Sequence, residues 1–293
     1  MSFEQTLIAS GFRPRIVQAD GKWRRCATDD KPKKRNGAYV LYPDGRGYFR
    51  NWAVDSELNK WEDGAAKMAS KIDPEKIQRQ KDAERRYRIS AMAGARARWA
   101  DSKPMRGLHP YLEAKQLTAE GCQGLRVFGD CLVVPVFWGD SLASIQTINP
   151  DGDKRFWAGA PVKGGAFVLR RPGAALTAVC EGLATGLAIY QSMRHASVVV
   201  AFDAGNLLPV VERLKPTGSV VICADNDHAT QAKRGFNPGI DKAQNVAELI
   251  GAGVAWPEGI EGSDWADALI EWGEKSHKRI ERLIQAKARY VMA

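Results

Sequence analysis

The chain has 293 residues, of which 44% are hydrophobic and 26% are charged, and its formal net charge is +9. These values are ordinary for a globular protein of one large domain or two smaller ones that buries a real core. No apolar run approaches the roughly 18 residues of a membrane-spanning helix, and the N-terminus lacks the basic and then apolar order of a secretory signal. We therefore expect a cytoplasmic protein with no membrane partner.

The cysteines do not indicate a zinc module or a disulfide framework. The five cysteines form no CxxC pair, and Cys180 and Cys223 fall within predicted buried strands, so we expect inert core thiols. Only Cys26 precedes residue 109, and the first histidine is His109. This composition excludes a conventional Cys/His zinc module in the first third of the chain.

The positive charge is concentrated at the N-terminal end. Residues 1–106 hold 24 Lys and Arg against 14 Asp and Glu, whereas residues 107–293 hold 19 against 20. A basic appendage of this kind is typical of proteins that neutralise nucleic-acid phosphates. The alternative is that the surplus serves solubility alone.

Residues 1–66 predict a small β-rich module. A helix is expected at 3–10, and a turn rich in Gly and Pro between 39–42 and 48–52 predicts a hairpin. Aromatic rings interleave with basic residues here, and exposed rings beside cations stack single-stranded bases. The alternative is that most rings form the core of the module, which leaves one or two for nucleic acid. The candidate DNA contacts in this module are Arg24, Arg25, Lys33, Lys34, Arg35 and Trp52.

Residues 67–106 predict a basic helical linker. The stretch from Pro74 to Trp99 is nearly free of Gly and Pro and is dense in Lys, Arg, Ala and Glu, which predicts a long, exposed helix. Arg85 and Arg86 are candidate contacts to a nucleic-acid backbone. The default alternative is a solvated helix that links two domains.

Residues 107–172 predict a mixed α+β subdomain, the N-terminal part of a catalytic core. A short helix at 108–117 precedes four predicted strands, at 125–128, 131–137, 142–148 and 166–170. The loops carry Lys154, Arg155 and Lys163, which are candidates to bind a triphosphate or the template. The glycines at 159–165 do not have the spacing of a P-loop.

Residues 173–262 alternate between strand and helix patterns. Strands are predicted at 176–180, 197–202, 219–224 and 253–256, with helices at 183–193, 206–214 and 238–250 between them. Short connections between alternating elements predict right-handed βαβ units and an α/β fold with a four-stranded parallel sheet that helices cover on both faces. Residues 263–293 predict a helical tail that ends in an amphipathic helix at 276–291.

Two of these predicted strands end in acids. Glu181 follows the strand at 176–180, and Asp225 and Asp227 follow the strand at 219–224. Because alternate residues of an extended chain point the same way, both aspartates converge on one cation. The carboxyl ends of parallel strands are the ligand-binding edge of such sheets, and carboxylates suit Mg²⁺ or Mn²⁺. The alternative is that each acid caps the helix that follows it.

These residues resemble a known family. Glu181 with Gly182, followed about forty residues later by Asp225-Asn226-Asp227, resembles the Toprim motifs of bacterial-type primases, topoisomerases, OLD-type nucleases and small RNA-maturation nucleases. The segment 151–165 resembles the stretch that precedes the Toprim fold in plasmid and phage primases. The resemblance covers roughly residues 107–270, and the order of its parts is more specific than either motif alone.

The resemblance implies a DNA primase, which makes short RNA primers on single-stranded DNA for a plasmid, phage or mobile element. It implies Glu181, Asp225 and Asp227 as catalytic acids and metal ligands, with Glu181 either a general base or a further ligand. Asp264 and Asp267 resemble a later metal-binding acid pair. The implied partners are the DNA template, ribonucleoside triphosphates and a separate replicative helicase.

Other assignments remain open. Asp203 and Asn206 follow the strand at 197–202 and either bind a phosphate or close a turn. A metal-dependent nuclease or a topoisomerase-like enzyme would use the same acids, although the chain has little room for a strand-gating region and no Walker A motif. In a third alternative, a non-catalytic nucleic-acid-binding protein, the acids are only helix caps.

Overall fold

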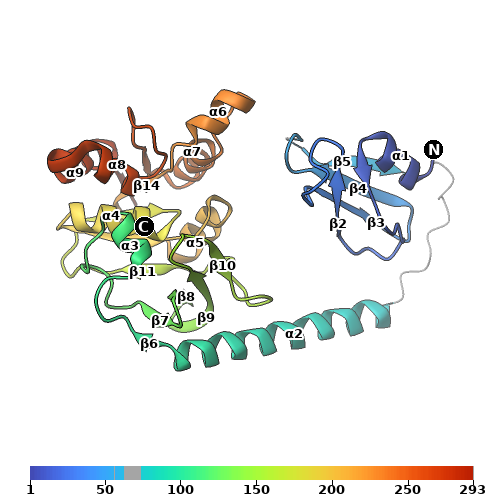
Figure 1. Ribbon diagram of the computed structural model, residues 1–293, viewed down its shortest axis with the longest axis horizontal. Helices are drawn as coiled ribbons and strands as arrows, with labels where there is room; N and C mark the ends of the chain where they lie inside the picture. The colour runs from blue at the N-terminus through green and yellow to red at the C-terminus, as the bar shows by residue number, and fades with distance from the viewer. Residues whose placement is uncertain (56, 63–73, 293) are drawn as a thin grey trace. The chain divides into compact units, whose positions relative to one another are not determined.

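The computed structural model describes residues 1–55, 57–62 and 74–292, and it divides the chain into two compact units, Met1–Asp82 and Ala83–Ala293 (Figure 1). The boundary expected between residues 66 and 67 lies outside the described residues. Among these residues, no helix is both long enough and apolar enough to cross a bilayer.

The N-terminal unit is an antiparallel sheet with one helix packed on it. Helix α1 (Phe3–Ala9) begins at Ser2, whose side chain and that of Gln5 form a capping box. Phe3 and Leu7 of the helix pack into a core with Phe12, Cys26, Tyr39 and Phe49. The strands lie in chain order: β1 (Phe12–Arg13), β2 (Arg24–Thr28), β3 (Gly37–Leu41), β4 (Arg46–Asn51) and β5 (Asn59–Glu62).

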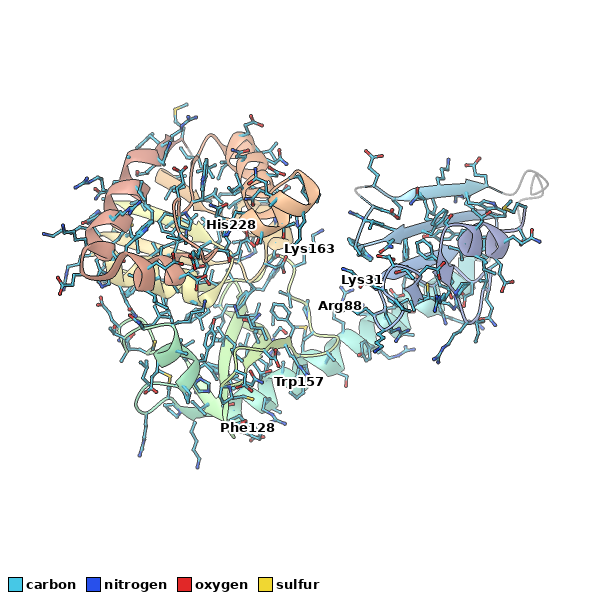
Figure 2. The ribbon with its side chains drawn as sticks, turned by 45° about the horizontal axis from the view of Figure 1, so that its top comes forward. Lys31, Arg88, Phe128, Trp157, Lys163 and His228 are labelled. Carbon is cyan, nitrogen blue, oxygen red and sulfur yellow. The ribbon has the colours of Figure 1, made fainter. Side chains whose placement is uncertain are left out.

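Helix α2 (Pro74–Asp101) is long, and most of its described side chains are exposed, as its composition predicts, but it also docks on the C-terminal unit. Its second half packs on the first sheet of the C-terminal unit, where Ala91 and Ala95 are buried in a cluster with Val133 and Ile145. Figure 2 shows Trp157 and Phe128 beside this part of the helix. A side chain at Gly94 would press against the indole ring of Trp157, because its Cβ would lie 3.1 Å from that ring. Small residues on one face of a highly charged helix therefore let it dock closely.

This docking gives a matched pair of substitutions. Ala95→Asp would place a carboxylate in an apolar contact, whereas Ala97→Asp would place it on the exposed face. We expect Ala95→Asp to lower the free energy of unfolding of the C-terminal unit by ~3 kcal/mol, and Ala97→Asp to change it little. Urea unfolding followed by tryptophan fluorescence measures both. Equal losses in the two variants would contradict the docked position of the helix.

The antiparallel sheet under α2 forms the first layer of the C-terminal unit. Its order is β10 (Lys154–Phe156), β9 (Ser141–Ile148), β8 (Cys131–Trp138), β7 (Arg126–Phe128) and β6 (Lys103–Pro104). Helix α3 (Pro110–Ala114) begins at His109, whose Nδ1 accepts a hydrogen bond from the backbone N–H of Tyr111. The strand predicted at 166–170 belongs elsewhere, because β11 (Phe167–Leu169) pairs with β13 (Ala196–Val200) of the next sheet.

The second sheet of this unit has six strands. Four of them run parallel in the order β13, β12 (Leu176–Cys180), β14 (Gly218–Cys223) and β15 (Gly253–Ala255). Strand β11 adds an antiparallel edge, and β16 (Arg289–Val291) pairs antiparallel with the first half of β14. The C-terminal amphipathic helix, expected to reach residue 291, therefore ends at Lys287, and the β-forming residues Tyr290 and Val291 extend the sheet instead.

Helices cover both faces of this sheet. Alternate strand residues enter opposite cores: Ala178 and Cys180 face one cluster, and Val179 faces the other. The first face is covered by α4 (Leu183–Ser192), α8 (Trp265–Trp272) and α9 (Ser276–Lys287), and the second by α5 (Leu207–Leu214) and α7 (Pro238–Ile250). A short helix, α6 (His228–Arg234), follows the acid-bearing loop after β14.

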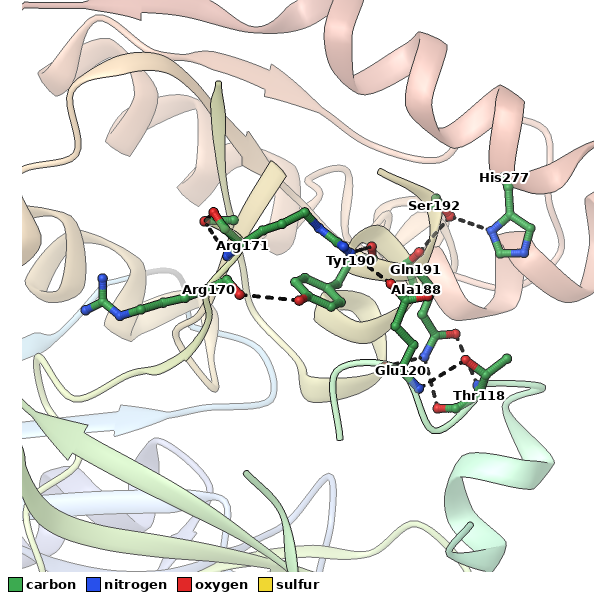
Figure 3. Close-up of polar contacts among 10 residues, drawn as sticks. Thr118, Glu120, Arg170, Arg171, Ala188, Tyr190, Gln191, Ser192 and His277 are labelled. Carbon is green, nitrogen blue, oxygen red and sulfur yellow. Dashed lines mark hydrogen bonds and ion pairs between the residues drawn. The ribbon is translucent and has the colours of Figure 1, made fainter. Parts of the chain in front are cut away.

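A polar network fastens the two layers of the unit together (Figure 3). The side-chain amide of Gln191, near the end of α4, donates to the carbonyl oxygens of Thr118 and Glu120 at 3.0 and 2.9 Å. The guanidinium of Arg171 donates to Glu120 at 3.0 Å and stacks 4.0 Å above the ring of Tyr190. The segment that follows α3 is therefore fixed to the helix that begins beside Glu181.

Candidate active site

Two neighbouring strands bring the acids to one edge of the six-stranded sheet. Strand β12 ends at Cys180 and is followed by Glu181, and β14 ends at Cys223 shortly before Asp225. Cys180 and Cys223 are direct partners across the two parallel strands. The carboxyl ends of both strands therefore point to the same edge, as the sequence predicts. We refer to Glu181, Asp225 and Asp227 as the acid triad.

Glu181 has a buried carboxylate oxygen that lacks a partner. Its Oε1 is buried and accepts no hydrogen bond from the described residues. Burial raises the pKa of Glu181 to about 7, and the negative charges of Asp227 and Asp203 add to this effect, while Lys242 opposes it. An unpaired buried carboxylate oxygen is costly, so this position favours either a proton or a bound cation.

Asp225 has a similarly raised pKa. Burial raises the pKa of Asp225 to about 8, and repulsion from Glu181 and Asp264 contributes to the increase. The hydroxyl of Thr185, in the first turn of α4, donates a hydrogen bond to Asp225 Oδ1 at 3.0 Å and partly offsets the repulsion. Thr185 is the one polar residue in the apolar first two turns of α4, which is a weak signal for this contact in the sequence.

The alternative that these acids are helix caps does not fit Glu181 or Asp227. Gly182, and not Glu181, stands at the N-cap position of α4. Asp227 occupies the N-cap position of α6, but its side chain makes no capping hydrogen bond to the described residues of that helix. Both carboxylates therefore lack the structural role that a cap would give them.

Close packing shapes the loop that carries the aspartates. A Cβ at Gly239 in α7 would collide with the carbonyl oxygen of Asp225, so only glycine fits at this position. The amide of Asn237 bridges the loop, since its Oδ1 accepts from the N–H of Asp227 at 3.2 Å and its Nδ2 donates to Asn226 at 2.9 Å. The loop is held by the N-terminus of α7, which the sequence pattern did not reveal.

A strained residue leads into Asp203, at the end of the neighbouring strand β13. Phe202 has φ +73°, a left-handed conformation that is unfavourable for a bulky side chain. Its ring packs edge-on against Phe156 of β10, with ring centroids 5.8 Å apart. Asp203 is exposed, and its charge acts on Glu181. The strained turn therefore sets Asp203 beside the acid triad.

Asn206 supports a loop from within. Its side chain is buried, its Oδ1 accepts a hydrogen bond from the N–H of Gly164 at 2.7 Å, and its Nδ2 donates to the carbonyl oxygens of Gly165 and Ala201. Lys163, one of the predicted cationic contacts, is exposed on the same loop. In place of the predicted contact to a phosphate, the amide of Asn206 thus holds the loop that presents Lys163.

Lys154, one of the predicted cations, lies close to the residue that follows Glu181. Its Nζ would lie 3.9 Å from a Cβ at Gly182, the residue after Glu181, and 5.8 Å from the ring centroid of Tyr111. Arg155 is exposed next to it on β10. A flexible ammonium group at the margin of a carboxylate cluster is suited to bind the phosphates of a metal-bound nucleotide.

Asp264 and Asp267 have other partners than those predicted. They form a capping box at the start of α8, in which Asp264 Oδ1 accepts from the N–H of Asp267 at 2.7 Å. Lys115 Nζ contacts Asp264 Oδ2 at 3.1 Å and Asp267 Oδ1 at 2.7 Å. As the side chains stand, residues 1–55, 57–62 and 74–292 contain no group of three His, Cys, Asp or Glu within reach of one ion.

The acid triad nevertheless has the chemistry of a divalent-metal site. It offers hard carboxylate oxygens, two of its pKa values are raised by burial and mutual repulsion, and one oxygen is unsatisfied. A divalent cation would bind the carboxylate oxygens, offset the repulsion that raises the two pKa values and give the unsatisfied oxygen a partner. Glu181, Asp225 and Asp227 therefore have the ligand chemistry that suits Mg²⁺ or Mn²⁺, although their side chains as they stand do not surround one point.

The N-terminal unit has a basic surface with two exposed indole rings. Trp23 and Trp52 are each about half exposed, whereas Tyr39 and Phe49 are in the core. The guanidinium groups of Arg50 and Arg25 lie 4.3 and 5.5 Å from the Trp52 ring centroid. Arg25, Ala38 and Arg50 form one row across β2, β3 and β4, so both arginines flank this ring from the same face of the sheet.

A cavity of about 380 Å³ adjoins this face. It is lined by Arg15, Ile16, Trp23, Arg24, Arg25, Arg35 and Tyr39. Asp20 neutralises part of this charge, because it accepts two hydrogen bonds from the guanidinium of Arg24 at 2.8 Å. Lys33 and Lys34 are exposed on the preceding loop. Arg15, Arg25 and Arg35 also line the cavity, so it remains positively charged although Asp20 neutralises Arg24. The indole ring of Trp23 forms part of its wall.

Comparisons with known proteins identify part of this architecture. A family model described as Toprim domain matches residues 176–275, from β12 to the turn after α8. The chain carries a Toprim domain. The acid triad lies within this Toprim domain, and Lys154, Lys163 and the N-terminal unit lie outside it.

The chain is also similar to a curated primase. It is 29% identical over 259 residues to DNA primase TraC of Escherichia coli, a match that covers 81% of this chain and 18% of that protein. The chain thus spans less than a fifth of the length of this relative. The resemblance to Toprim-domain primases of the plasmid and phage type, which was predicted from the motifs, is confirmed by these two matches.

Solved structures of primases also match the chain, each with a TM-score below 0.5. One is a chain from the complex of bacteriophage T7 lagging-strand DNA polymerase with the primase domains of two gp4 subunits, with a TM-score of 0.44, 13% identity and coverage of 60% of this chain and 90% of that one. The primase fragment of the T7 primase-helicase protein has a TM-score of 0.43, 13% identity and coverage of 61% and 78%. The RNA polymerase domain of Mycobacterium tuberculosis primase DnaG has a TM-score of 0.37, 17% identity and coverage of 61% and 62%.

Proposed function

We propose that this Toprim-domain protein is a DNA primase, a nucleotidyltransferase that makes short RNA primers on single-stranded DNA for the replication of a plasmid, phage or mobile element. The observation that carries the proposal is the convergence of Glu181 and Asp225 at the ends of adjacent parallel strands, with raised pKa values and an unpaired carboxylate oxygen. The similarity to a curated DNA primase over most of the chain supports the same activity.

The reaction joins a 3′-hydroxyl to the α-phosphate of a ribonucleoside triphosphate, and pyrophosphate leaves. Asp225 and Asp227 would hold Mg²⁺ or Mn²⁺, with Glu181 beside them, and the ion would neutralise charge that develops on the phosphate oxygens. Glu181 Oε1 is suited to take the proton of the attacking hydroxyl, since a pKa of about 7 matches the operating pH of a general base.

Cationic side chains around the triad would bind the nucleotide. Lys154 stands at the margin of the acids, and Lys163 is exposed on the loop that Asn206 holds. We assign both to the triphosphate or the template, together with Arg155. Asp203 is exposed, its charge acts on Glu181, and it would contact the bound nucleotide.

The N-terminal unit would bind the single-stranded template. Trp52 flanked by Arg25 and Arg50 is a platform on which a base can stack, and the surrounding Lys and Arg would contact phosphates. Arg85 and Arg86 of α2, which belong to the other unit, are exposed and would contact a nucleic-acid backbone as well. A replicative helicase in the cytoplasm is a further proposed partner, since primers are made where duplex DNA has been opened.

The platform makes a measurable prediction. Trp52→Ala is expected to weaken the binding of single-stranded DNA about tenfold, because the loss of one stacked base costs ~1–3 kcal/mol. Arg25→Ala should reduce the slope of log affinity against log salt by about one phosphate contact. Fluorescence anisotropy with a labelled oligonucleotide at several salt concentrations measures both.

Arg13→Ala is the matched control for this surface. Arg13 is a similarly exposed arginine of the same unit, but Asp29 neutralises it at 2.7 Å, and it lies on the edge strand β1, in the row next to that of Arg25, Ala38 and Arg50. It should leave affinity nearly unchanged. If Trp52→Ala and Arg13→Ala bind DNA equally well, the platform does not contact the template.

Primer synthesis itself is the decisive assay for the activity. The purified protein, a single-stranded DNA template, ribonucleoside triphosphates and Mg²⁺ or Mn²⁺ should yield short oligoribonucleotides. Degradation of the template without synthesis would instead support the metal-dependent nuclease, which would use the same acids. DNA binding with neither synthesis nor degradation under these conditions would support a non-catalytic binding protein.

A further inference from the structure

The second acid pair of the site is already saturated with hydrogen bonds. Each of the four carboxylate oxygens of Asp264 and Asp267 accepts at least one. Asp264 Oδ1 accepts from the N–H of Asp267 at 2.7 Å, and Asp267 Oδ2 accepts from the N–H groups of Ser263 and Asp264 at 3.0 and 3.2 Å. The remaining two oxygens accept from Lys115 Nζ, at 3.1 and 2.7 Å. This pattern contrasts with Glu181 Oε1, which is bare.

Lys115 is positioned to act as a fixed cation. It stands at the C-cap of α3, in the other layer of the unit, and its side chain is only 26% exposed. Burial acts to lower the pKa of Lys115, but the two carboxylates outweigh burial and hold that pKa above its ordinary value. The ammonium group is therefore charged at any pH at which the protein would work. Hydrogen bonding to Lys115 in turn lowers the pKa of Asp267 against the opposing effect of burial.

This cation belongs electrostatically to the active site. Asp264 contacts Lys115 Nζ at 3.1 Å, and its charge also contributes to the raised pKa of Asp225, so one carboxylate interacts with both groups. In sites that bind two metal ions, carboxylates between the ions share their charge. In this chain the ammonium group of Lys115 contacts Asp264 and Asp267, where such a site would hold its second ion.

We propose that Lys115 is a built-in cation that occupies the Asp264–Asp267 pair in place of a divalent ion, so that the chain binds divalent metal through the acid triad alone. Lys115 in this sense limits the number of ions that the site binds and fixes the side chains of Asp264 and Asp267. The proposal rests on the proposed function for the identity of the site, but its test counts bound ions and requires no primer synthesis.

The ions can be counted directly with Mn²⁺ on the full chain. Electron paramagnetic resonance of free Mn²⁺ during a titration gives the number of ions bound to wild type and to three variants: Lys115→Met, Lys115→Arg and the double variant Asp264→Asn/Asp267→Asn. We expect the double variant to bind as many ions as wild type, because in wild type that pair holds Lys115. Loss of about one ion per chain in the double variant would overturn the proposal.

The Lys115 variants test whether removal of the ammonium group frees the acid pair to bind a metal ion. Lys115→Met leaves two carboxylates without their cation and should gain about one Mn²⁺ per chain, whereas Lys115→Arg keeps the charge and should match wild type. An unchanged count in folded Lys115→Met would also overturn the proposal. If that variant does not fold, the double variant decides alone, since Asn still caps a helix.

Asp225→Asn separates this proposal from the proposed function. It should lose a bound ion if the acid triad holds metal, whatever the role of Lys115. Wild type that binds Mn²⁺ as expected but makes no primer would refute the primase assignment and leave the role of Lys115 intact. Conversely, if wild type makes primers but the double variant loses a bound ion, the proposed role of Lys115 is refuted and the primase assignment stands.

Discussion

Asp225→Asn is expected to lower the rate of primer synthesis by about a thousandfold, because it removes one metal-binding carboxylate while keeping the shape of the side chain. Asp225 is the acid whose charge is most disfavoured by its surroundings, through burial and through repulsion from Glu181 and Asp264. The asparagine can still accept the hydrogen bond from Thr185. Primer length and yield on a single-stranded template, resolved on a denaturing gel, measure the loss.

Asp140→Asn is the matched control for this substitution. Asp140 is an exposed aspartate in the turn between β8 and β9, and the same change there removes one negative charge from the C-terminal unit. It should retain wild-type synthesis. Comparable activity in Asp140→Asn and Asp225→Asn would exclude the acid triad as the catalytic centre.

The second large effect is a loss of stability as the pH rises in the absence of metal. The pKa values of Glu181 and Asp225 are raised in the folded chain, to about 7 and about 8, from ordinary values of 4.5 and 3.8. The folded state therefore binds protons more tightly than the unfolded state. The stability that these protons contribute is fully present below pH 4 and is lost as the pH rises through 7 and 8.

As the pH rises through this window, the free energy of unfolding should fall by up to about 1.4 kcal/mol per pH unit for each group that titrates independently. The fall should be smaller for the coupled pair. Thermal unfolding in a chelating buffer at pH 6 and pH 8 measures the loss. Saturating Mg²⁺ should restore the stability at pH 8, because a ligand that binds only the folded state stabilises it by mass action.

Asp225→Asn provides the control for this pH dependence. The amide cannot ionise, so the metal-free variant should be more stable than metal-free wild type at pH 8, although it is inactive. A variant that is less stable than wild type under these conditions would show that the folded chain does not disfavour the ionised form of Asp225. The opposite effects on activity and stability are typical of an active site that is shaped for a ligand.

Much of the Toprim sheet could be predicted because its strands are short apolar runs bounded by helices with clear ends. Helix α7 begins at Pro238 and ends before Gly251, in a left-handed C-cap, and both residues indicate those ends in the sequence. The acids at the ends of β12 and β14 could be placed at one edge for the same reason. Parallel strands joined by crossovers leave no other edge for their carboxyl ends.

Contacts between distant segments could not be predicted in this way. Lys115 reaches Asp264 and Asp267 across about 150 residues of chain, and no local pattern links them. The docking of α2 escaped prediction because its apolar contact consists of alanines within a charged helix, which give little periodic pattern. Strand β16 was hidden by the helical pattern that precedes it, since only two residues separate the end of α9 from Tyr290.

Strand β16 has a consequence for the order in which the molecule assembles. One edge of β14 is completed by two partners, β15 beside Val221 to Cys223 and β16 beside Gly218 to Val220. The strand that presents Asp225 therefore acquires its last hydrogen bonds only after residues 289–291 have emerged from the ribosome. A nascent chain that ends before residue 289 would expose an unpaired segment of β14 beside the acid triad, so this edge of the sheet closes only once the segment after α9 has been made.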